Sequence, residues 1–206
     1  MKKYMDKLNI KINKNLFIFL LTIVIIGITA GALFTAVLNT QDKQLVVEYL
    51  NAFFTNITTN KLNYTNSLLN SLILSPGLAI IIWLLGISVI GLVLIIVILF
   101  LKSFVLGFSI SSIIASYKLK GLIYAFIYTF PHLIINILVF ILISAFALIM
   151  SFKIINSITS KTVLDLKHYM NKYLTILIIT IIILIITSLY EIYIMPKILN
   201  IILSIN

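Results

Sequence analysis

The stretch LAIIIWLLGISVIGLVLIIVILFLKSFVLGFSISSIIASY, residues 78–117, decides the fold, because it is apolar along its whole length apart from Lys102. Forty residues of helix measure about 60 Å, which is twice the thickness of the hydrocarbon core of a bilayer. One span cannot contain this stretch. The sequence therefore predicts two helices with a reversal near Lys102. A re-entrant segment over 103–117 is the alternative to a second full span.

Composition assigns the chain to the membrane proteins. Of its 206 residues, 62% are hydrophobic and only 10% are charged, and the mean hydropathy is +1.23. A soluble domain cannot bury that much apolar surface and stay in solution. We therefore expect an all-α, polytopic integral membrane helical bundle.

The charged residues and the absence of cysteine exclude several functions. The net charge of +10 comes from 15 basic residues, all of them lysine, against five acids. These lysines are scattered and form no basic patch interleaved with aromatic residues, so nucleic-acid binding is not expected. Without cysteine, disulfides, thiolate metal sites and thiol catalysis are excluded.

About five spans are expected, with one of the helices broken at Pro131. The expected spans are 16–38, 78–101, 103–117, 122–150 and 173–195. They form a single membrane domain, 16–206, after a basic N-terminus at 1–15, with an outer loop at 39–75 and a cytoplasmic loop at 151–172. With the N-terminus inside, ten of the 15 lysines face the cytoplasm, as the positive-inside rule favours. A re-entrant 103–117 would change the division to nine against six.

Small residues at intervals of four predict close contacts between spans. Gly27 and Gly31 form a GxxxG pattern on which another helix can approach closely. A second face of this kind is made by Ser103, Gly107, Ser111 and Ala115. The residues around Gly31 also resemble a signal-peptide cleavage site, but the apolar run continues to Leu38, which favours a retained span.

Polar residues in TFPHLIINIL, residues 129–138, require an explanation at bilayer depth. A single helix over 122–150 would measure about 43 Å, too long for one span without strong tilt. Pro131 can instead begin a new helix, where its missing N–H costs nothing. His132 and Asn136 share one face of that helix and can satisfy carbonyls freed by the break. A proton or substrate role for this pair is the alternative.

Two further segments carry expectations. In the outer loop, Leu45, Tyr49 and Phe53 recur at helical spacing, which predicts a short amphipathic helix that lies on the membrane or docks a partner. Glu191 lies near Lys197 and the predicted membrane edge, so we expect a solvated interfacial acid.

The segment WLLGISVIGLVLIIVILFLKSFVLGFSI, residues 83–110, resembles the central segment of the stage II sporulation protein M family. The resemblance continues in YLNAFF of the outer loop and in the Pro-His pair, and it covers most of 16–153. The wider family often shows Pro-His-Gly followed by Glu, five residues after the proline. Here Leu133 stands in place of the Gly and Asn136 in place of the Glu.

The resemblance implies a non-enzymatic scaffold at the sporulation septum. Family members act in the mother-cell membrane during engulfment, where they anchor and recruit peptidoglycan-degrading stage II proteins of the D and P type. No catalytic residue, cofactor or metal is expected, because the chain has no HExxH motif, no paired Asp and no Ser with a convincing base. A homo-oligomer is left open. The alternative function is a small transporter or permease-like subunit that uses the broken helix around His132 and Asn136.

Overall fold

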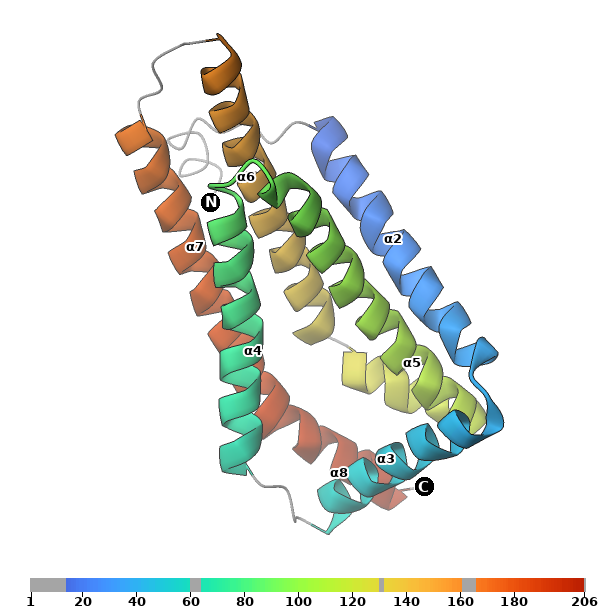
Figure 1. The fold of residues 1–206 in the computed structure, drawn as a ribbon. Coiled ribbons are helices and arrows are strands. Elements are labelled where there is room, and N and C mark those ends of the chain that lie inside the picture. The colour runs from blue at the N-terminus through green and yellow to red at the C-terminus, as the bar shows by residue number, and fades with distance from the viewer. Residues whose placement is uncertain (1–13, 60–63, 130–131, 161–165, 206) are drawn as a thin grey trace.

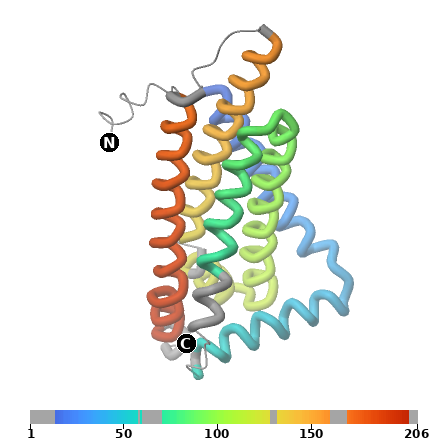
Figure 2. The backbone as a smooth tube through the Cα atoms, turned by 60° about the vertical axis from the view of Figure 1, so that its left-hand side comes forward, coloured from blue at the N-terminus to red at the C-terminus, as the bar shows by residue number. Residues whose placement is uncertain are grey.

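The computed structural model describes residues 14–59, 64–129, 132–160 and 166–205. In this part of the chain nearly every residue is helical and none is in a strand. The helices are α2 (Lys14–Val37), α3 (Thr40–Thr58), α4 (Tyr64–Leu85), α5 (Gly91–Thr129), α6 (His132–Ser160), α7 (Leu166–Leu189), the π-helix η1 (Tyr190–Ile194) and α8 (Met195–Ile205). α2, α4, α5, α6 and α7 run along one another as a bundle, and α3 and α8 lie across one end of it (Figures 1 and 2).

The helices have the length and apolarity that a membrane protein requires. Among the described residues, four stretches are long and apolar enough to cross a bilayer: Lys14–Val37, Gly91–Ile127, His132–Thr159 and Tyr169–Ile201. A shorter apolar helix, Ser71–Leu85, belongs to α4 and runs beside them (Figure 1). The expectation of an all-α membrane bundle is confirmed, and the four long apolar stretches with the shorter Ser71–Leu85 are compatible with about five spans.

The reversal inside 78–117 lies at residues 86–90, and the prediction of a reversal near Lys102 is wrong. The α4 helix ends with Gly86 N–H donating to Ile82 O at 3.0 Å, and α5 begins at Gly91. A Cβ at Gly91 would collide with the backbone of Leu85, so only glycine fits this tight turn. Lys102 consequently lies well inside α5.

A second break divides α5. Lys118 has φ 51° and ψ −126°, and no other described non-glycine residue has a positive φ. The chain changes direction there, as the polar sequence YKLKG predicts (Figure 1). α5 ends at Thr129 and α6 begins at His132 as a separate helix. Pro131, which was expected to mark this break, lies outside the described residues.

The polar segment 39–75 is largely helical. Its first part is α3, capped by the Asn39 side chain, which accepts the Asp42 N–H at 2.7 Å. Residues 64–75, expected in the outer loop, form the first half of α4. The cytoplasmic loop is shortened in the same way, because α6 continues to Ser160.

Two apolar cores hold the helices together. The larger core joins α2, α4, α5, α6 and α7. The smaller core lies at the end of the bundle, where Phe54 and Ile57 of α3 pack with Ile113, Tyr124 and Leu199. The amphipathic helix is therefore fixed to the bundle by buried side chains of its own.

Candidate functional site

A partly open cavity with polar and charged lining lies between α5, α6 and η1. Its volume is about 170 Å³. The polar lining residues are Lys102, Ser109, Asn136 and Glu191, and four aliphatic side chains complete the wall. Ionisable side chains within spans are costly and usually face the protein interior, which makes this cavity the first candidate site.

Glu191 reaches the cavity because the last span changes its winding. Residues 190–194 form the π-helix η1, a local bulge of the kind that often occurs at functional sites. Glu191 is half-buried, and its Oε2 accepts the Ser71 hydroxyl at 3.0 Å. The expectation of a solvated acid at the membrane edge is therefore wrong.

Asn136 joins the same cluster from α6. Its side chain is 5% exposed, and its Oδ1 accepts the Thr187 hydroxyl at 2.6 Å. His132, four residues earlier, is fully buried, and its ring centroid lies 6.2 Å from that of Tyr190. The predicted polar pair is thus inside the protein, but only Asn136 lines the cavity.

Lys102 approaches the cavity from the middle of α5. Its Nζ lies 5.2 Å from the centroid of the Phe140 ring, which fits a cation–π contact. The sequence pattern predicts Lys102 in a reversal and Glu191 at the membrane edge, and therefore does not indicate this site. The signal that could have found the site is that both charges stand inside or next to apolar runs long enough to span.

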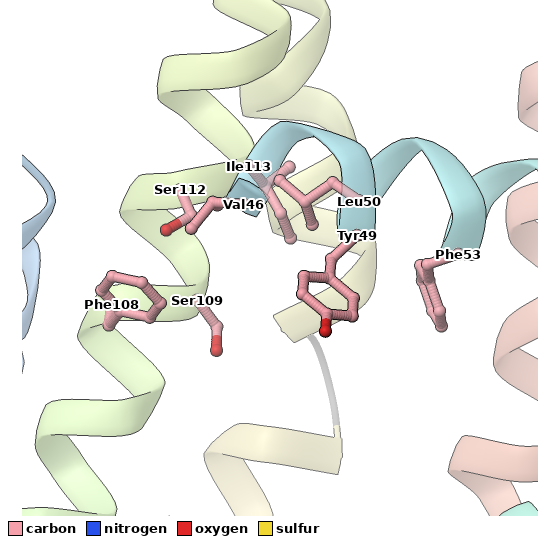
Figure 3. A pocket seen from close by; sticks show the side chains of 8 residues that line it. All are labelled: Val46, Tyr49, Leu50, Phe53, Phe108, Ser109, Ser112 and Ile113. Atoms are coloured by element: carbon pink, nitrogen blue, oxygen red, sulfur yellow. The ribbon is translucent and has the colours of Figure 1, made fainter. Parts of the chain in front are cut away.

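A second cavity, of about 270 Å³, lies between α3 and the first half of α5 (Figure 3). It is mainly apolar: Val46, Tyr49, Leu50 and Phe53 of α3 face Phe108, Ser109, Ser112 and Ile113 of α5 across it. Of the predicted partner contacts, Tyr49 is 77% exposed, Leu45 is 51% exposed, and Phe53 is half-buried against Phe54.

The small-residue faces meet in the contact between α2 and α5. A Cβ on Gly27 would reach Ser103, and Cβ atoms on Gly31 and Gly107 would collide with the backbone of the opposite helix. The Ser111 hydroxyl donates to Ala32 O across the same contact at 3.3 Å. Ala115, at the end of the face, is exposed. Whether the protein's function requires these small residues stays a prediction.

Both cavities offer groups that can hold a ligand. In the part of the chain that the structure describes, no group of three His, Cys, Asp or Glu side chains could hold a metal ion. The charged cavity offers one ammonium, one carboxylate, one amide and one hydroxyl group. The cavity between α3 and α5 offers apolar surface with two serine hydroxyls.

The fold and the two cavities define a polytopic helical membrane protein with an amphipathic helix across one end. The family model described as Stage II sporulation protein M matches residues 17–196. The chain therefore belongs to the stage II sporulation protein M family, and the resemblance found in the sequence is confirmed. Comparison with curated proteins and with solved structures gave no match.

Proposed function

We propose that the protein is a non-enzymatic membrane scaffold that acts in engulfment during endospore formation. It anchors and recruits the peptidoglycan-degrading stage II proteins of the D and P type in the mother-cell membrane at the septum. Membership of the sporulation family supports this role at the level of the process. The surface offered by α3 supports it at the level of the molecule.

The observation that carries the proposal is the position of α3. The smaller core fixes this helix across one end of the bundle (Figure 2). On it, Tyr49 and Leu45 stay largely exposed beside the apolar cavity. Exposed aromatic and aliphatic groups next to a preformed apolar groove are typical of a surface that binds a helix or loop of another protein.

The scaffold requires α3 to face outward, toward the peptidoglycan. This orientation follows from the lysine distribution, which favours a cytoplasmic N-terminus. We expect a cysteine introduced at Gln44 of α3 to react with an impermeant maleimide on intact cells, and one at Asn156 of α6 to react only after lysis. Both positions are exposed and the chain has no native cysteine, so each signal has one source. Labelling of Asn156→Cys on intact cells would show that the protein has the opposite orientation in the membrane.

The scaffold role is tested by removing the apolar groups of α3. Strains carrying Tyr49→Ala together with Phe53→Ala are expected to stall in engulfment while the protein still reaches the membrane. Membrane-dye microscopy scores engulfment, and immunoblotting of the membrane fraction gives the protein level. Tyr49→Ala alone is also needed, because Phe53 packs against the smaller core and its loss could destabilise α3.

Gln44→Ala is the matched control, since Gln44 is exposed on the same helix but does not line the cavity. It should engulf as wild type does. A defect of equal size in Gln44→Ala would point to α3 stability and not to a contact surface. Normal engulfment in the Tyr49 and Phe53 variants would contradict the scaffold proposal.

The transporter alternative is favoured by one observation, the charged cavity that Asn136 lines. This alternative predicts the opposite pattern of engulfment defects. A strain with well-expressed Asn136→Ala would then fail in engulfment, while the α3 variants would be silent. The scaffold proposal expects His132→Ala and Asn136→Ala to be nearly silent wherever the fold survives.

A further inference from the structure

The two charges of the cavity between α5, α6 and η1 face the same space without touching each other. Lys102 and Glu191 both line the cavity. No N–O distance of 4.0 Å or less joins them as an ion pair. The ammonium lies over the Phe140 ring, and the carboxylate accepts from Ser71.

This separation distinguishes the cavity from a structural ion pair. Charges removed from water lose several kcal/mol of hydration each, and a structural pair recovers this loss through direct contact and hydrogen bonds. Here each charge has one polar or aromatic neighbour on the protein and an open side toward the cavity. A bound group that carries one negative and one positive charge could lie between the two side chains and form an ion pair with each of them.

The size and remaining lining agree with such a group. A buried water needs only about 10–15 Å³ of comparable volume, whereas the cavity provides about 170 Å³. The Asn136 amide and the Ser109 hydroxyl add hydrogen-bonding groups, and the aliphatic wall suits a short carbon chain. The cavity can therefore hold a small group of several heavy atoms.

We propose that this cavity binds a zwitterionic group, whose anionic end pairs with Lys102 and whose primary ammonium end pairs with Glu191. Two sources present this chemistry: the phosphoethanolamine headgroup of a membrane lipid, and a free amino acid. The site shares only Ser109 with the lining of the cavity between α3 and α5, and it does not depend on the scaffold role.

Each source is tested with a pair of probes of which one carries the ammonium group and the other keeps the anionic group without it. Native mass spectrometry of the purified full chain in detergent compares phosphatidylethanolamine with phosphatidylglycerol. Isothermal titration calorimetry compares glycine with N-acetylglycine, which keeps the carboxylate but has no ammonium. We expect the ammonium-bearing member of one pair to bind about tenfold or more tightly than its analogue, the range of one or two charge-assisted hydrogen bonds.

Variants then assign the two ends. Glu191→Gln should remove the preference for the ammonium-bearing probe, and Lys102→Gln should weaken binding of both members of the pair. Glu48→Gln and Lys197→Gln are the matched controls, because each removes the same charge from an exposed site. Equal binding within both probe pairs by the wild-type protein overturns the proposal without reference to any variant. A preference that survives Glu191→Gln in folded protein overturns the assignment to this cavity.

Discussion

Replacing Gly107 with Leu is expected to reduce the amount of protein in the membrane to a small fraction of the wild-type level. Gly107 of α5 lies directly against α2, where an added Cβ would collide with the carbonyl and Cα of Ile28. Gly31 of α2 makes the reciprocal approach to the backbone of Phe104 and Phe108. Because the obstacle is backbone on both sides, a larger side chain fits only if the helices separate.

The cost of that separation should be at least about 3 kcal/mol, the upper part of the range for overpacking. A destabilised membrane protein is degraded, so immunoblotting of membrane fractions measures the effect. Gly77→Leu is the matched control: Gly77 also lies in an apolar helix, but nothing lies within 4 Å of a Cβ built there. Leucine has the better helix propensity, so Gly77→Leu should accumulate normally. If Gly107→Leu accumulates to the same level as Gly77→Leu, α2 and α5 do not make this close contact in the membrane.

The contact between α2 and α5 shows what the sequence can reveal. Helical spacing alone places Gly27 and Gly31 on one face and Ser103, Gly107 and Ser111 on another, because the helix period is fixed. That the two faces meet each other cannot be read from spacing, since any helix with a small-residue face could serve as the partner. The class of fold follows from composition and length in the same direct way.

The turn at 86–90 lies where the sequence has no polar residue that predicts a reversal other than Ser88. Polar residues usually mark a reversal, so Lys102 was the natural break to predict in 78–117. The chain instead turns in the apolar sequence GISVIG, where Gly86 and Gly91 permit close backbone contacts. The carbonyl of Ser88 in this turn accepts the Ser151 hydroxyl from α6 at 2.7 Å. A tertiary contact of this kind leaves no periodic signal in the sequence.

The charged cavity was missed for a related reason. A lysine in a reversal and an acid at the membrane edge are both solvated, so neither predicted position requires an opposite charge nearby. Glu191 also lies in a π-helix, a rare winding for which the sequence gives no signal. The arrangement of α4, α5, α6 and η1 in space brings Ser71, Lys102, Asn136 and Glu191 together.

The stability of the bundle should reveal that Lys102 and Glu191 compensate each other. Lys102→Met leaves the carboxylate of Glu191 in a span without an opposite charge, and Glu191→Gln leaves the ammonium in the same condition. Removing one member of a buried charge pair costs about 3–5 kcal/mol. Because this pair is half-buried and separated by a cavity, we expect about 2–3 kcal/mol for each single variant, seen as a lower midpoint of denaturation in mixed micelles.

The double variant, Lys102→Met with Glu191→Gln, should be more stable than either single variant. It places no charge in the cavity, and the introduced glutamine can still accept the hydrogen bond from Ser71. Coupling energies between interacting sites commonly reach about 0.5–3 kcal/mol in either direction, and we expect about 1–2 kcal/mol of restored stability here.

Lys197→Met combined with Glu48→Gln provides the control for this cycle, since both residues are exposed and belong to different helices. Their effects should be small and additive. If the losses from Lys102→Met and Glu191→Gln also add, the two charges do not compensate each other across the cavity. Each must then be stabilised separately by its own neighbour, the Phe140 ring for the ammonium and the Ser71 hydroxyl for the carboxylate.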